Sequence, residues 1–121
     1  MPQYASILDH ANDARTRILE VAYDTLDYPG ESGTIYLDVR EPSEFATGHI
    51  DGALNLSWTL IEANVGEIVP NKSTPIVAYC AIGHRSAIAA DILQNLGYTQ
   101  VVSIKGGLQG VGESSHFALV A

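Results

Sequence analysis

The sequence has a single cysteine, Cys80, and little positive charge. One thiol cannot form an internal disulfide or a C-x-x-C redox or zinc motif. Six Lys and Arg residues stand against 14 Asp and Glu residues, a formal net charge of -8 that argues against binding to nucleic acid or anionic lipid. No apolar run approaches the ~20 residues that span a bilayer, and MPQYASILDHANDARTR lacks the regions of a signal peptide. We therefore expect no nucleic-acid or membrane partner.

The composition is that of an ordinary globular chain. Its 121 residues are 46% hydrophobic and 17% charged, which suits one domain with its own core. No repeat, low-complexity tract or linker interrupts them, so we predict a single domain over residues 1–121. The lack of disulfides and of a secretion signal leads us to expect a cytoplasmic protein.

Short apolar runs predict the strands of a buried sheet. Residues 34–39, 75–79 and 101–104 are apolar at nearly every position, and 52–56 is a shorter candidate. This pattern is typical of strands covered on both faces, as in a parallel sheet between helices. The predicted fold class is therefore α/β.

Helices are predicted around these strands. An amphipathic pattern over 85–97, closed by Gly97, predicts a helix between two strands and hence a βαβ unit. Two further helices are predicted over 41–48 and over 57–66, the second ending at its terminal glycine. In the N-terminal segment, one long helix and a short strand at 17–21 between two helices both fit the periodicity.

The segment CAIGHR, residues 80–85, is the strongest candidate for a site. Cys80 follows the strand at 75–79 directly, at the sheet edge where ligands bind in open α/β folds. A loop that contains Gly83 and no proline can turn its amides inward, and the next helix adds the positive end of its dipole. Such surroundings favour a thiolate, and Arg85 adds a permanent charge suited to an oxyanion.

Two other roles for Cys80 stay open on these residues. Free cysteine is often a small buried hydrophobe, although the strand-end position, Gly83 and Arg85 favour a nucleophile. A metal site could use Cys80 with His84. It ranks last, because the remaining histidines are scattered without metal-ligand spacing: His10, His49 and His116.

Several motifs occur in a fixed order along the chain. They are DVRE at 38–41, GHIDGA at 48–53, the cysteine loop with GHRS at 83–86, LGY at 96–98 and GG at 106–107. Together they resemble a single-domain rhodanese, that is, a thiosulfate sulfurtransferase-like domain. The resemblance runs from about residue 18 to residue 110.

The resemblance implies a twisted, mostly parallel sheet with helices on both faces, and a first strand at 18–21. It also implies a sulfurtransferase that carries a sulfane sulfur as a persulfide on Cys80 and needs no metal or organic cofactor. The donor would be thiosulfate or a persulfide, and the acceptor a thiol, cyanide or a protein. The residues expected to bind the donor are Ala81, Ile82, Gly83, His84 and Arg85.

The chain departs from the family pattern at two places. Many members have a basic residue directly after the cysteine, where this chain has Ala81 and Ile82, and this apolar mouth favours a persulfide over thiosulfate. The tail LQGVGESSHFALVA lacks the Trp that is common there, so we expect it to pack differently.

Three alternative functions follow from other classes. Tyrosine-phosphatase-like enzymes of this fold use C-x5-R, whereas Cys80 and Arg85 form the shorter C-x4-R, so phosphatase activity ranks low. A non-catalytic rhodanese-like module would bind a protein partner instead. A redox sensor would need a resolving thiol from another molecule.

Other polar and aromatic residues have structural explanations. We expect Asp38 and Arg40 to form a structural charge pair, and His49 to lie in a glycine-bounded turn. The aromatic residues expected in core or rim packing are Tyr36, Trp58, Tyr79 and Tyr98.

Overall fold

A parallel sheet forms the centre of the protein in a computed structural model that describes residues 4–30 and 33–121. The sheet has five strands in the order β1-β6-β5-β2-β4, and each neighbouring pair is parallel. The strands are β1 (Leu19–Val21), β2 (Ile35–Asp38), β4 (Leu54–Asn55), β5 (Ile76–Tyr79) and β6 (Val101–Ile104). The α/β prediction and the strand predictions are confirmed, including the short one within 52–56.

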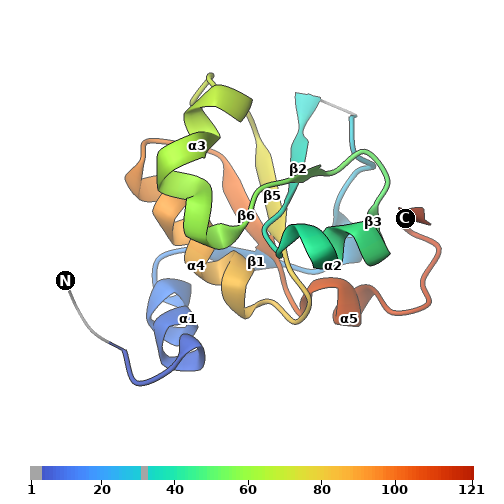
Figure 1. The fold of residues 1–121 in the computed structure, drawn as a ribbon, viewed down its shortest axis with the longest axis horizontal. Helices are drawn as coiled ribbons and strands as arrows, with labels where there is room; N and C mark the ends of the chain where they lie inside the picture. The colour runs from blue at the N-terminus through green and yellow to red at the C-terminus, as the bar shows by residue number, and fades with distance from the viewer. Residues whose placement is uncertain (1–3, 31–32) are drawn as a thin grey trace.

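Helices cover both faces of this sheet (Figure 1). On one face lie α3 (Ile61–Ile68) and α4 (His84–Asn95), with α1 (Ile7–Arg15) packed on α4. On the other face lie α2 (Pro42–Thr47) and α5 (Gly107–Val111), together with the 3-10 turn Tyr23–Thr25. Because α4 ends at Asn95 and Gly97 follows with a φ of +103°, the predicted glycine stop is confirmed.

The N-terminal segment is broken rather than one helix. The backbone N–H of Thr16 caps the end of α1, and β1 pairs with β6 from Leu19 to Val21. At the other end of the chain, β7 (Leu119–Val120) pairs antiparallel with β3 (His49–Ile50). His49 therefore lies in a short strand formed by this pairing, and not in the glycine-bounded turn that the sequence predicts. The tail also places Phe117 against the buried ring of Tyr36.

The prediction that Gly66 ends a helix is wrong. A 3-10 turn, Trp58–Leu60, follows Ser57, and α3 then continues through Gly66 to Ile68. Ile61, Val65 and Val69 repeat every four residues and are all buried, so core contacts hold the helix together past the glycine. The chain leaves the helix only before Pro70, which cannot continue it.

Buried polar and aromatic residues match their predicted structural roles. Asp38 and Arg40 form an ion pair of 2.7 Å between Oδ2 and Nη2, with side chains 0% and 8% exposed. Tyr36, Tyr79 and Tyr98 are buried, and Trp58 packs at the edge of the core. Within residues 4–30 and 33–121, no helix is long and apolar enough to cross a membrane.

Candidate active site

Cys80 lies at the carboxyl edge of the sheet, between β5 and α4. The strand ends at Tyr79, and Gly83 is the N-cap of the helix, with a left-handed φ of +100°. This conformation favours glycine, and it lets the chain turn from strand to helix within three residues of Cys80. The Cys80 side chain lies inside the loop and is only 1% exposed.

Backbone amides point at the sulfur atom. The N–H of Gly83 lies 3.1 Å from Cys80 Sγ, and the N–H of Ser86, in the first turn of α4, lies 3.3 Å from it. Both donors favour a negatively charged sulfur, as does the positive end of the helix dipole. Ser86 lies one position beyond the predicted donor-binding residues, although the GHRS motif contains it.

Two buried hydroxyls complete the surroundings of the sulfur. Ser86 Oγ lies 3.4 Å from Cys80 Sγ and donates to the carbonyl of Gly83, while Ser103 Oγ lies 2.8 Å from Ser86 Oγ. Ser86 and Ser103 are both 0% exposed. The Sγ position is therefore fixed from β6 as well as from the loop.

The glycine pair Gly106–Gly107 lets the start of α5 pack closely against the backbone of the Cys80 loop. The amides of Leu108 and Gln109, at the start of α5, donate to the carbonyls of Cys80 and Ala81 at 2.9 Å each. A Cβ at Gly107 would lie 2.4 Å from the Cys80 carbonyl oxygen, so only glycine permits this approach. With their carbonyls bound by α5, Cys80 and Ala81 have a fixed backbone direction.

Arg85 lies on α4 and is already bound by a carboxylate. Its Nη1 and Nη2 donate to the two carboxylate oxygens of Glu44, at 2.6 and 2.9 Å. Hydrogen bonds from Arg85 lower the pKa of Glu44 to about 2, although burial of the carboxylate acts in the opposite direction and raises it. The same hydrogen bonds raise the pKa of Arg85, although burial of the guanidinium lowers it. Negative charge on Cys80 would raise this pKa further. No sequence pattern identifies Glu44 as this partner, because it lies 41 residues from Arg85 in the chain.

The remaining loop residues form the mouth of the site. Ile82 is 48% exposed and gives the mouth an apolar side chain, while Ala81 is half-buried. His84 begins α4, is half-buried, and has Nδ1 3.0 Å from the guanidinium of Arg15.

The other histidines have partners of their own. His49 Nδ1 bonds to the Phe45 carbonyl at 2.8 Å and its ring stacks on Phe45, while His116 bonds to the Leu26 carbonyl. His10 stacks on Tyr4. In the part of the chain that the structure describes, no three His, Cys, Asp or Glu side chains are grouped to hold a metal ion.

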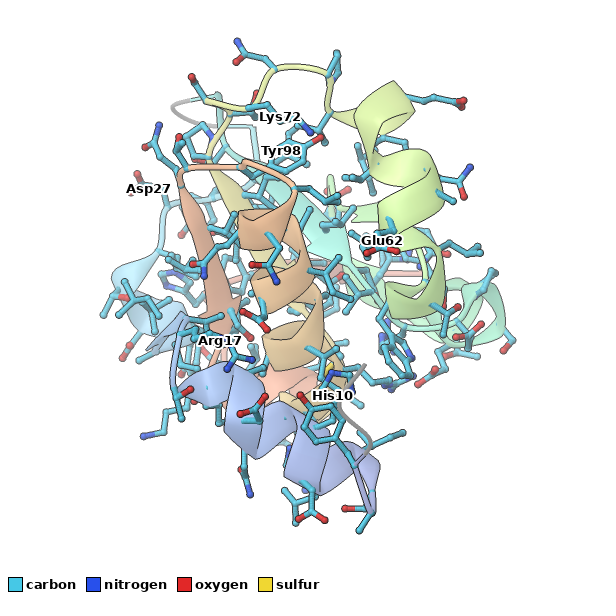
Figure 2. All side chains as sticks on the ribbon, turned by 90° about the vertical axis from the view of Figure 1, so that its left-hand side faces the viewer. His10, Arg17, Asp27, Glu62, Lys72 and Tyr98 are labelled. Atoms are coloured by element: carbon cyan, nitrogen blue, oxygen red, sulfur yellow. The ribbon has the colours of Figure 1, made fainter. Side chains whose placement is uncertain are left out.

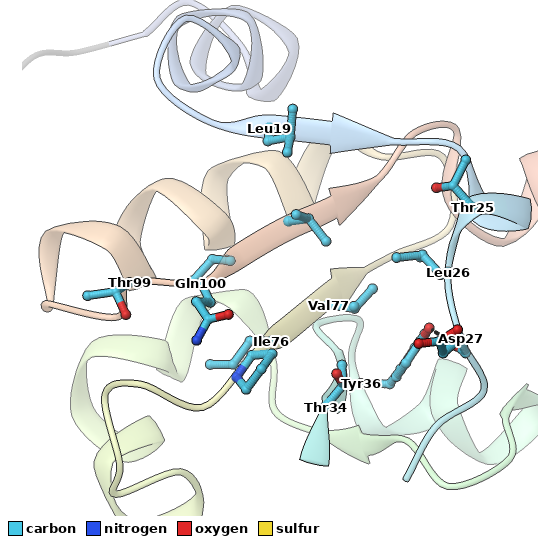
Figure 3. A pocket seen from close by; sticks show the side chains of 13 residues that line it. Leu19, Thr25, Leu26, Asp27, Thr34, Tyr36, Ile76, Val77, Thr99 and Gln100 are labelled. Atoms are coloured by element: carbon cyan, nitrogen blue, oxygen red, sulfur yellow. Dashed lines mark hydrogen bonds between the residues drawn. The ribbon is translucent and has the colours of Figure 1, made fainter. Parts of the chain in front are cut away.

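A separate hollow of about 400 Å³ lies at the opposite edge of the sheet (Figure 3). Its lining includes Thr34, Pro75 and Gln100, which directly precede β2, β5 and β6. No thiol, imidazole or cationic side chain is among its lining residues. Cys80 and the amides that donate to it thus lie at the carboxyl edge, away from this hollow.

Comparison with known proteins agrees with this geometry. The model of the Rhodanese-like domain family matches residues 22–114. The thiosulfate sulfurtransferase PspE of Escherichia coli (strain K12) is 33% identical over 76 residues, which cover 63% of this chain and 72% of PspE. A solved rhodanese from E. coli, with anions, has a TM-score of 0.63 at 30% identity and covers 72% of this chain and 96% of its own. RPA3614 of Rhodopseudomonas palustris, described as a protein of unknown function and possible tyrosine phosphatase, has a TM-score of 0.80 at 26% identity over 99% of both chains.

Proposed function

The chain belongs to the rhodanese-like domain family, and on that premise we propose that it is a sulfurtransferase that moves a sulfane sulfur through a persulfide on Cys80. The observation that carries the proposal is the pair of amides, from Gly83 and Ser86, directed at Sγ. They would bind the thiolate before the reaction and the anionic product after it.

The transfer takes two displacement steps. In the first, the Cys80 thiolate attacks the outer sulfur of the donor, whose S–S bond breaks, and the leaving group departs with the electron pair as a thiolate or as sulfite. In the second, a nucleophilic acceptor attacks the terminal sulfur of Cys80–S–S⁻, and the Cys80 thiolate is released. The sulfur moves without an external oxidant or reductant.

A persulfide suits this mouth better than thiosulfate as the donor. The exposed side chain at the entrance is Ile82, and the guanidinium of Arg85 is paired with Glu44. A small dianion therefore meets little free positive charge, whereas the carbon groups of a protein-bound or small-molecule persulfide can contact the apolar rim. Acceptors of this chemistry are a thiol, cyanide or a protein.

Phosphatase activity is second to sulfur transfer in this loop. RPA3614 is described as a possible tyrosine phosphatase, but here only four residues separate Cys80 from Arg85. Because this loop is one residue shorter than C-x5-R, we expect it to fit one sulfur atom and to crowd a tetrahedral phosphoryl group. The guanidinium that would bind phosphate is also engaged by Glu44.

The test is sulfur transfer with a matched serine variant. We expect thiocyanate to form from cyanide above the uncatalysed rate with glutathione persulfide as donor, more slowly with thiosulfate, and only at the uncatalysed rate with Cys80→Ser. After donor treatment the Cys80 peptide should gain about 32 Da, one sulfur atom, which a reductant removes. Native protein that neither gains this mass nor turns over would refute the proposal and leave a non-catalytic role, as a protein-binding module or a redox sensor.

A further inference from the structure

Arg15, the last residue of α1, contacts the Cys80 loop from outside it. Its Nη2 donates to the Gly83 carbonyl at 3.2 Å and lies 3.0 Å from His84 Nδ1. The rest of the guanidinium is held as well, by Glu20 on Nε at 3.2 Å and by Asn12 on Nη1 at 2.9 Å. Arg15 is therefore fixed on the two residues that begin α4.

This contact determines which nitrogen of His84 carries the proton. A guanidinium only donates hydrogen bonds, so Nδ1 must accept, and the proton of the neutral ring is on Nε2. Among the described residues none hydrogen-bonds to Nε2, and no buried side-chain nitrogen there lacks a partner. The Nε2–H group of His84 therefore reaches solvent at the start of α4, four residues from Cys80.

We propose that Arg15 is a positioning residue of the site: it fixes the Gly83 carbonyl and holds His84 in the tautomer whose Nε2–H donates to the anionic sulfur donor. Gly83 is also the residue whose N–H binds Cys80 Sγ. One side chain thus orients both a group that contacts the sulfur and a hydrogen-bond donor at the mouth. The expected effect of Arg15 on the kinetics rests on the proposed sulfur transfer. The expected tautomer of His84 does not depend on that function.

Arg15 lies before the residues that match the family model, which begin at residue 22. The attachment of α1 does not depend on it alone, because Arg17 makes two hydrogen bonds to Asp91 of α4, at 3.0 and 2.8 Å. Figure 2 shows Arg17 where the end of α1 meets α4. Arg17→Gln therefore weakens the docking of α1 without touching the loop, and Glu20→Gln removes the ion pair of Arg15 without removing its loop contacts.

The first measurement is the ¹⁵N NMR spectrum of the His84 ring in the full chain. In the native protein we expect the Nε2–H tautomer, with Nδ1 accepting a hydrogen bond. Arg15→Gln should move the Nδ1 resonance and populate the Nδ1–H form, while Arg17→Gln and Glu20→Gln leave the ring unchanged. A His84 spectrum that is the same in native protein and Arg15→Gln overturns the proposal, whether or not sulfur transfer is found.

The second measurement is sulfur transfer from glutathione persulfide by the same variants. Arg15→Gln should lower kcat/KM on the order of tenfold, the effect of losing one hydrogen bond to a charged group, mainly through KM. Arg15→Lys, which can still donate to Nδ1, should recover part of the loss. In a His84→Ala background the effect of Arg15→Gln should shrink severalfold, and an undiminished effect there would refute action through His84.

Discussion

Replacing Gly107 by alanine tests the close contact between α5 and the Cys80 loop. The new Cβ would lie 2.4 Å from the Cys80 carbonyl oxygen and 2.7 Å from both the carbonyl carbon and the carbonyl oxygen of Ala81. All three atoms belong to the backbone, so no side-chain rotation can relieve the overlap. Gly106→Ala is the matched control, because its φ of +77° is also left-handed but its Cβ would make only an ordinary contact of 3.4 Å with Gly110.

The expected magnitude has two parts. A non-glycine residue in the left-handed region costs about 1–2 kcal/mol, and this applies to both alanines. Overpacking against a rigid neighbour costs about 1–3 kcal/mol more, and only at Gly107. Gly107→Ala should thus lower the free energy of unfolding by about 2–5 kcal/mol, or Tm by roughly 8–20 °C, against about 4–8 °C for Gly106→Ala.

Thermal unfolding of the two variants and the native protein gives the comparison directly. Alkylation of Cys80 by iodoacetamide, followed in the folded protein, reports whether the loop has moved. We expect the Gly107→Ala loop to show an altered alkylation rate, since its Cys80 and Ala81 carbonyls can no longer keep their bonds to α5. Equal Tm values for the two alanine variants would refute the reasoning.

Three further predictions concern charge. Asp38→Ala should lower the free energy of unfolding measured in urea by about 3–5 kcal/mol, because the buried Arg40 guanidinium loses its ion partner. A loss below about 1 kcal/mol would contradict this prediction. Glu44 has a pKa of about 2 against an ordinary 4.5, so it stabilises the folded protein above pH 4.5 and loses this contribution as the pH falls through 2. The stability difference between native protein and Glu44→Gln should therefore close over that range, and a constant difference down to pH 2 would exclude the ion pair with Arg85 as its source. Ile82→Arg should raise the rate with thiosulfate relative to that with glutathione persulfide, and an unchanged ratio would show that the mouth does not select the donor.

The fold follows largely from local patterns in the sequence. The apolar runs identify β2, β5 and β6 because strands that are buried on both faces contain few polar residues. Gly97 marks the end of α4 because residues other than glycine rarely adopt a φ of +103°. Periodicity alone leaves the N-terminal segment undecided, and the family resemblance selects the broken form. β3 and β7 could not be predicted from local patterns, because each strand has only two residues and forms by pairing with the other.

The candidate site, like the fold, has one part that the sequence predicts and one part that it does not. The loop from Cys80 to Ser86 is continuous in sequence, so Cys80, Gly83 and Arg85 can be identified from the sequence as candidate site residues. Glu44, Ser103 and Arg15 come from α2, β6 and α1, and no spacing in the sequence connects them to Cys80. The charge of Arg85 is therefore predictable, but its neutralisation by Glu44 is not.

The pairing of β1 with β6 also sets an order of events during synthesis of the chain. Leu19 lies beside Val102, so 83 residues (102 minus 19) must be added before the first strand meets its partner. At about 5–20 residues per second, this takes roughly 4–17 s on the ribosome. Until then Leu19 and its neighbours have no sheet to join, and α1 must likewise wait for α4. The contact of Arg15 with Gly83 and His84 thus forms only after most of the polypeptide has been made.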